Sequence, residues 1–482
     1  MVPRSTVWIV STMALACGAP APPAVIAPPA APPAAPLLPP APPVLPVAEA
    51  VDAGPAATAA PSLTPPASAT PATPAAPVAA GADWPMFHGG RERTGRSSAS
   101  AIARPHIRWT ADIGIQGYLD SPLVAGSLAV VPSSGTKHNA RDASDGVFAL
   151  DLATGRVVWQ AHTDGDANGA AVTGNRVVVT SDDGTVRGLE LSTGREVWKA
   201  SGKGKVYSHP LVVGDEVVVG DASGAVRAFE WATGKPRWRA QMSGAIRGGI
   251  AADDRAIYVV SQGGEVAAFT ADGATLWRKQ PTRPDFDGKN QVPIEGYAAP
   301  VVASELLVVP FARDTYYPVP ALLALDRTTG AIRWRAQGRG KDDWGNIRST
   351  PALVGGTLVY AEPYSGDVVG VDAAAGRVLY RQTVGGCYFP QYASPASAGE
   401  LAYVPRFDGV LYAVRVRDGG VAWKMYLGDK AQAGTQVPLA AKSCEWDVPS
   451  GSPLYSPVAV APDGTVLAGN GAGTLFAIEE QR

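Results

Sequence analysis

The chain of 482 residues is poor in the residue types that hold transition metals and has little excess charge. Three cysteines and five histidines leave little material for a metal site built from these ligands. Lys and Arg together number 41 and Asp and Glu 43, for a net charge of -2. This balance gives no reason to expect nucleic acid or an acidic membrane surface as a partner. No apolar run approaches the roughly 18 residues that a membrane-spanning helix needs.

Signatures of several catalytic and metal-binding sites are also missing. No Ser/His/Asp arrangement or phosphate-binding loop stands out, and no Cys-x-x-Cys-His marks an attached haem. The acidic stretch 285–290, followed by Glu295, departs from a calcium-binding EF-hand loop at Lys289 and Asn290. We therefore interpret it as a polar loop, with cation binding as the lesser alternative.

The first 17 residues are typical of an export signal. Arg4 supplies the positive charge, an apolar stretch runs from Val7 to Ala16, and small residues precede Cys17. Residues 14–17 resemble a bacterial lipobox, although Ala14 stands where Leu is usual. The resemblance predicts lipidation of Cys17 and an exported, membrane-anchored protein on the outer-membrane, periplasmic or cell-surface side. Ordinary secretion with a chance cysteine is the alternative.

Residues 18–82 form a segment rich in Pro and Ala. Positions 18–80 contain 20 of the 44 prolines, no aromatic residue, and only Glu49 and Asp52 as charges. Such a composition cannot bury a core, and its prolines favour extended conformations. We predict a disordered tether that holds the folded domain, residues 83–482, away from its anchor.

A hairpin motif recurs through the folded domain. The stretch 148–159 (FALDLATGRVVW) reads as a strand, a Thr-Gly turn and a second strand ending in an aromatic residue. Related copies end at positions 198, 238, 277, 334, 380 and 423. A period of ~40 residues with four short strands per repeat is the pattern of a β-propeller.

The two ends of this domain predict how the ring closes. His106–Trp109 reads as the last strand of a repeat without its first three, whereas Pro457–Ile478 provides three strands without a fourth. Together they complete one blade and remove the exposed sheet edges. The prediction is an all-β, eight-bladed β-propeller of four-stranded antiparallel blades. The closing aromatics are expected to dock adjacent blades: Trp109, Trp159, Trp198, Trp238, Trp277, Trp334, Tyr380 and Trp423.

The repeat resembles that of the pyrroloquinoline-quinone (PQQ) type propellers. The pattern Ala-x-Asp-x-x-Thr-Gly-x-x-x-Trp begins at Ala149 and again at Ala324, and residues 83–90 are similar to the start of many such proteins. One branch of this superfamily comprises PQQ- and calcium-dependent alcohol and sugar dehydrogenases. Another comprises non-catalytic scaffolds such as the outer-membrane assembly lipoprotein BamB.

The dehydrogenases typically carry adjacent cysteines against the quinone and bring Glu, Asn and Asp to calcium. This chain has no Cys-Cys pair, and no such ligand set is found by motif. The resemblance therefore favours a non-catalytic envelope lipoprotein that serves as a protein-binding scaffold, with no cofactor expected. A PQQ- and calcium-dependent dehydrogenase is the second reading, and a surface-displayed binder of carbohydrate or peptide the third.

Cys387 and Cys444 each lie in a loop before the first strand of a blade. These blades are adjacent, so the two loops are expected on the same rim, and export favours a disulfide between them. Two free structural thiols are the other case.

The candidate binding surface is the rim around the central channel. Residues just before the inner strands are expected to point there, and the loops 133–146 and 311–320 to overhang it. Tyr and Arg are frequent at interface hot spots, although these tyrosines could instead only plug the channel, and His209 is more readily a structural histidine than a catalytic base. The candidates are Tyr118, Asp120, Tyr207, His209, Arg247, Tyr297, Arg313, Tyr316, Tyr317, Arg348, Tyr392 and Tyr455.

Overall fold

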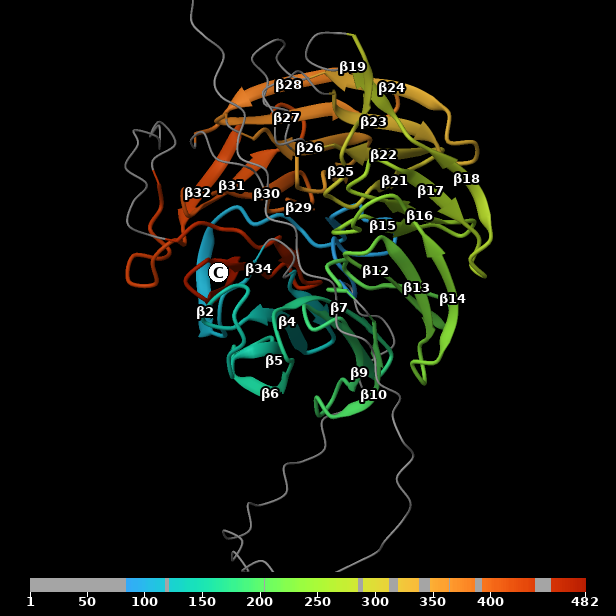
Figure 1. The fold of residues 1–482 in the computed structure, drawn as a ribbon. Helices are drawn as coiled ribbons and strands as arrows, with labels where there is room; N and C mark the ends of the chain where they lie inside the picture. The colour runs from blue at the N-terminus through green and yellow to red at the C-terminus, as the bar shows by residue number, and fades with distance from the viewer. Residues whose placement is uncertain are drawn as a thin grey trace, which may run out of the picture. The chain divides into compact units, whose positions relative to one another are not determined.

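The computed structural model describes residues 84–117, 121–202, 204–284, 289–311, 320–337, 347–363, 365–385, 392–437 and 452–482. The predicted all-β fold is confirmed, because these residues form strands and turns arranged as eight four-stranded blades in a ring (Figure 1). Within this part of the chain, no helix is long and apolar enough to span a membrane.

Blades A to D follow one another along the chain, each an antiparallel sheet in sequence order. Blade A comprises β3 (Leu123–Ala125), β4 (Leu128–Ser134), β5 (Asp145–Asp151) and β6 (Val157–His162). Blade B comprises β7 (Ala167–Thr173), β8 (Arg176–Ser181), β9 (Thr185–Glu190) and β10 (Glu196–Ser201). Blade C comprises β11 (Leu211–Val213), β12 (Glu216–Gly220), β13 (Ala225–Glu230) and β14 (Pro236–Gln241). Blade D comprises β15 (Ile250–Ala252), β16 (Ile257–Val260), β17 (Val266–Phe269) and β18 (Thr275–Lys279).

Blades E to G continue the series, and the small hairpin of β19 (Thr282–Pro284) and β20 (Gln291–Pro293) precedes them. Blade E comprises β21 (Val301–Ala303), β22 (Leu306–Pro310), β23 (Pro320–Asp326) and β24 (Ile332–Gln337). Blade F comprises β25 (Ala352–Val354), β26 (Thr357–Ala361), β27 (Asp367–Asp372) and β28 (Val378–Thr383). Blade G comprises β29 (Ala396–Ala398), β30 (Leu401–Pro405), β31 (Val410–Arg415) and β32 (Val421–Tyr426).

Blade H joins the two ends of the domain, as predicted. Its strands β33 (Ala459–Val460), β34 (Val466–Gly469) and β35 (Thr474–Glu480) come from the C-terminus, and β2 (Pro105–Asp112) from the N-terminal side. In Figure 1 the blue β2 lies beside the red C-terminal strands and forms the edge of this sheet. The pairing of β2 with β35 covers the outer edge of the last C-terminal strand and closes the ring.

The closing aromatic of each blade packs on the hairpin turn of the next blade. In blade A, Gly155 takes a φ of 72°, a conformation that glycine adopts without strain, and its N–H donates to Asp151 O at 2.8 Å. The indole of Trp109 in blade H covers this glycine, and its Nε1 donates to Leu152 O at 2.9 Å. Trp159, Trp198, Trp238, Trp277 and Trp334 donate in the same way to the following blade, and Trp423 donates to Ile102 O, which precedes β2.

Tyr380 occupies the same position in blade F without an indole N–H. Its ring lies against Gly419 of blade G. The buried apolar clusters likewise combine neighbouring blades, as where Val147 of blade A packs with Val179 of blade B. The hydrophobic core therefore lies between the blades rather than within any one of them.

The segment 84–99 precedes β2 and lies inside the ring, and we name it the collar (Figure 1). It follows the channel-facing edges of the inner strands from blade A to blade G. It ends in β1 (Arg96–Ser97), which pairs in parallel with β29. Carbonyls of the collar accept from Val124, Val172, Ala252, Val302, Leu353 and Ser397, and Met86 Sδ accepts from the N–H of Val212.

Candidate functional site

A cavity of about 830 Å³ opens where the inner strands begin, and we name this end of the ring the mouth. Because strands alternate in direction, the segments between blades and the turns between second and third strands meet at this end. The volume lies within the range of ligand pockets. The lining residues come from seven of the blades and the segments before them: Ile115, Gly117, Ser134, His138, Asn139, Asp166, Asn168, Asp182, Tyr207, Arg247, Arg348, Tyr392, Phe407, Tyr455 and Gly471.

Two arginines of the mouth stack on tyrosines. The Arg247 guanidinium lies 4.5 Å from the ring centroid of Tyr207. The Arg348 guanidinium lies 4.6 Å from the Tyr297 ring and 5.2 Å from the Tyr392 ring, and it donates to Tyr392 Oη at 3.1 Å. A guanidinium on an aromatic face makes a favourable cation–π contact. The two arginines therefore bring positive charge to the mouth in an aromatic setting.

An aromatic pair continues this wall. Phe407 lies 5.8 Å from Tyr392 and meets Tyr455 edge to face at 4.7 Å between ring centroids. Burial raises the pKa of Tyr455, so its hydroxyl stays protonated and can donate or accept a hydrogen bond.

Blade B contributes carboxylates to the opposite side. Asp166 precedes β7, and Asp182 lies in the turn between β8 and β9. Asn168 donates to Asp182 Oδ1 at 2.8 Å, and Lys205 pairs with the other oxygen. The hydrogen bond to Asp182 raises the pKa of Lys205. Asp182 is thus paired with the lysine ammonium, whereas Lys205 acts on Asp166 only through its charge.

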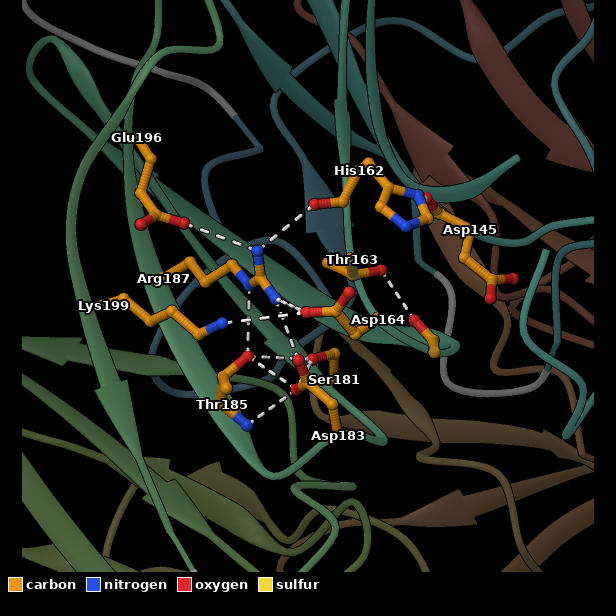
Figure 2. Close-up of polar contacts among 11 residues, drawn as sticks. Asp145, His162, Thr163, Asp164, Ser181, Asp183, Thr185, Arg187, Glu196 and Lys199 are labelled. Atoms are coloured by element: carbon orange, nitrogen blue, oxygen red, sulfur yellow. Dashed lines mark hydrogen bonds and ion pairs between the residues drawn. The ribbon is translucent and has the colours of Figure 1, made fainter. Parts of the chain in front are cut away.

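A polar network braces the turn that presents Asp182. Figure 2 shows the Arg187 guanidinium directed at Asp164 and Asp183, and it lies 2.9 Å from an oxygen of each. Burial alone would raise the pKa of Asp183, but bonds from Ser181, Thr185 and Arg187 together lower it to about 2. The network is nearly satisfied within itself, so it has a structural role.

The collar fills the interior of the ring beneath the cavity. Arg93 is fully buried and donates to Ile250 O, Phe87 O and Pro210 O. His88 faces Arg93 O at 2.6 Å and Pro395 O at 2.7 Å. Blades C and G stand opposite in a ring of eight, so this pair bridges the channel from Pro210 to Pro395.

Burial dominates the titration of both groups. It lowers the pKa of His88 to about 4 and that of Arg93 to about 9. The Phe87 ring stacks on His209 at 3.8 Å between centroids. The mouth is thus a funnel with a closed floor rather than an open pore.

The structure brings five of the predicted rim residues together in the cavity lining, namely Tyr207, Arg247, Arg348, Tyr392 and Tyr455. Tyr297 lies under Arg348, and its hydroxyl donates to Glu295 at 3.1 Å. His209 is 2% exposed and belongs to the floor with Phe87. Of the overhanging loops, 133–146 contributes His138 and Asn139 to the lining.

The remaining predictions fall outside the described residues: Cys17, Tyr118, Asp120, Arg313, Tyr316, Tyr317, Cys387, Cys444 and residues 285–288.

Sequence reasoning missed the acidic side of the funnel. Asp166 is the residue before β7 and Asp182 begins an Asp-Asp-Gly turn, so position in the repeat would have placed both at the mouth. Phe407 lies in the equivalent turn of blade G.

The described residues do not assemble a metal centre. Among them no three His, Cys, Asp or Glu side chains are placed to hold one ion. Calcium requires six to eight oxygen ligands, usually with several carboxylates. His, Cys, Asp and Glu side chains therefore do not gather as a three-ligand site within the described parts of the chain, and we derive no step through calcium or PQQ.

A closed ring of eight four-stranded blades defines the class of eight-bladed β-propellers. The family model described as "Outer membrane protein assembly factor BamB" matches residues 95–230 and 193–425, so the chain belongs to this family. A comparison with curated protein sequences found no match.

Solved structures share the fold at low identity. BamB from Moraxella catarrhalis is 16% identical, with a TM-score of 0.56 over 78% of this chain and 99% of that one. A europium-containing methanol dehydrogenase is 16% identical, with a TM-score of 0.60 over 82% and 98%. The quinohemoprotein alcohol dehydrogenase from Comamonas testosteroni is 14% identical, with a TM-score of 0.63 over 83% and 81%. At such identities the likeness concerns the fold.

Proposed function

We propose that this protein is a non-catalytic scaffold of the bacterial envelope that binds a protein partner at the mouth of its propeller. Residues 1–17 direct export, Cys17 is lipidated, residues 18–82 form the tether and residues 83–482 the binding domain. A disulfide between Cys387 and Cys444 pins two mouth loops. Membership of the BamB family supports protein partners and an envelope location.

The observation that carries this proposal is the lining of the funnel. Stacked arginines and tyrosines from several blades converge on one concave surface, and this is the composition of a recognition site. The closed floor favours a surface ligand over one that threads through the ring.

Site-directed photo-crosslinking in the native envelope tests the scaffold. A photoreactive phenylalanine replaces Tyr207 or Tyr455 in the full-length chain, and the control replaces Val197, which is 43% exposed on the outer strand β10. We expect discrete protein adducts from the two mouth positions and none from the control. Equal labelling at all three positions would count against a mouth-specific partner.

A titration with PQQ, with and without calcium, tests the dehydrogenase reading. The readouts are tryptophan fluorescence and dye-linked oxidation of alcohols and aldoses. Saturable, calcium-dependent binding with turnover would overturn the scaffold proposal. We expect neither binding nor turnover.

A further inference from the structure

Carboxylates of blade B and the guanidinium of Arg348 lie on opposite sides of the funnel, and Arg247, before blade D, lies between them around the ring. Blades B and F are four positions apart in a ring of eight, so they face each other across the channel. Blade B presents Asp166 and Asp182, whereas Arg348 immediately precedes blade F. Because Lys205 pairs with Asp182, the distinctive group on the acidic side is Asp166.

The Asp166 carboxylate is only partly satisfied. Its Oδ2 accepts from the backbone N–H of Asn139 at 3.0 Å and lies 3.3 Å from His138 Nδ1. Its Oδ1 is buried and has no hydrogen-bond partner among the described residues. The residue is 5% exposed and lines the cavity. A carboxylate oxygen that is buried away from water normally accepts a hydrogen bond, because burying it without one costs free energy.

A second buried carboxylate lies close to the first. Asp145 is fully buried, and its Oδ2 accepts from the N–H of Asp142 at 3.0 Å. Its Oδ1 also lacks a partner within the described parts of the chain. Burial, and then the charges of Asp142 and Asp166, raise the pKa of Asp145. Two carboxylates that repel each other form a site of concentrated negative potential.

The cations near this pair form no hydrogen bond with the Asp166 Oδ1 atom: Lys205 pairs with Asp182 and acts on Asp166 through its charge alone. Lys137 and Arg141 belong to the overhanging loop and are exposed, and neither forms an ion pair with Asp145 or Asp166 in the described structure. His138 is 41% exposed and contributes positive charge only when it is protonated.

We propose that Asp166, with Asp145 beside it, binds a basic side chain of the protein partner, and this inference rests on the proposed scaffold function. A guanidinium or ammonium group supplies several N–H donors in one small cation, which suits an orphaned carboxylate oxygen. Within the described residues no three His, Cys, Asp or Glu side chains are placed to hold one ion, and the calcium arm of the test below separates metal binding from this proposal. The partner segment places its cation against blade B, on the side of the funnel opposite Arg348.

Binding of short peptides to the full chain tests this cation-binding site at Asp166. The probe is the tripeptide Gly-Arg-Gly with blocked ends, titrated by calorimetry at low ionic strength because salt screens such contacts. Its matched control replaces arginine by citrulline, which keeps the shape and loses the charge. We expect saturable binding of the arginine peptide and at least tenfold weaker binding of the citrulline peptide.

Two substitutions locate the binding. Asp166→Asn keeps the shape of the side chain, and Asp215→Asn is the control, since Asp215 is 77% exposed in a turn at the opposite end of the ring. We expect at least tenfold weaker binding of the arginine peptide to Asp166→Asn and no change in Asp215→Asn. Equal binding of the two peptides, unchanged binding by Asp166→Asn, or no binding of either peptide would overturn the proposal.

Further measurements distinguish a peptide ligand from a small amine or a metal ion, and they distinguish failure of this inference from failure of the scaffold proposal. Free argininamide that binds as tightly as the tripeptide would indicate a small amine as ligand and overturn the polypeptide assignment. Calcium that displaces the tripeptide would indicate a metal site and overturn it as well. If Tyr207 and Tyr455 still give crosslinks but the arginine peptide does not bind, the scaffold proposal is retained and the cation site at Asp166 is rejected. If the crosslinks also fail, both proposals fall.

Discussion

Two glycines of blade C separate the cost of a strained backbone from the cost of disturbing a blade contact. Gly214 and Gly234 both lie in turns at the same end of the blade, with φ of 59° and 69°. A methyl group at Gly214 would meet no atom within 4 Å. At Gly234 it would lie 2.6 Å from Cδ2 of Trp198, the docking residue of the preceding blade.

The two alanine variants should therefore differ in stability. Both residues must hold Ala in a left-handed conformation, which costs about 1–2 kcal/mol. Gly234→Ala must also displace the Trp198 ring, at about 1–3 kcal/mol for overpacking. It weakens the hydrogen bond from Trp198 to Trp231 O, now 3.0 Å long, by about 1 kcal/mol. We expect Gly234→Ala to lower the free energy of unfolding by about 2–4 kcal/mol more than Gly214→Ala, the sum of these two contributions.

Urea unfolding of both variants, followed by circular dichroism, measures this difference directly. Equal losses of stability in the two variants would refute the view that stacking of the aromatic on the turn glycine holds neighbouring blades together. A larger loss in Gly234→Ala that Trp198→Leu reduces toward the loss in Gly214→Ala would support it, because the smaller side chain makes room for the methyl group.

Two further predictions concern the collar. Arg93→Met leaves three buried carbonyls without their donor, so we expect the free energy of unfolding in urea to fall by roughly 3 kcal/mol or more. Proteolysis within residues 84–99 should also become faster. The control Arg96→Met changes an exposed position of the same segment and should stay within about 0.5 kcal/mol of the parent. His88 has its folded pKa lowered to about 4, below the ordinary 6.5, so its contribution is full above pH 6.5 and is lost as the pH falls toward 4, by about 3 kcal/mol in total. Unfolding measured across this pH range should show a shallower slope for His88→Asn, and an unchanged slope would contradict the assignment.

The ring can be predicted from the sequence because each blade repeats the same local sequence motif. The Thr-Gly turn and the aromatic that follows recur with little variation, so the number of blades and the closure by β2 can be predicted from the sequence alone. The collar could not be derived in this way. Residues 84–99 have no repeat and form almost no regular strand, and their hydrogen-bond partners are distributed over seven blades.

The site was predictable only in part, for a related reason. Tyr207, Arg247 and Arg348 were identified because they precede inner strands and belong to types common in interfaces. Asp166 also precedes an inner strand, but an aspartate in a loop is ordinary in any sequence. Only the three-dimensional structure reveals that one of its oxygens is buried without a donor.

The path of the collar has a consequence for the order in which the protein can fold. This segment is synthesised before any blade, yet its last contacts lie on β29 of blade G. Strand β2 must likewise wait for β35, which lies at the end of the chain. Contacts between residues so distant in sequence slow folding, because the chain between them must be ordered first. The N-terminal portion therefore remains incompletely folded until the last blade is available, and a chain that lacks its C-terminal strands would leave both the outer edge of blade H and the interior of the ring unfinished.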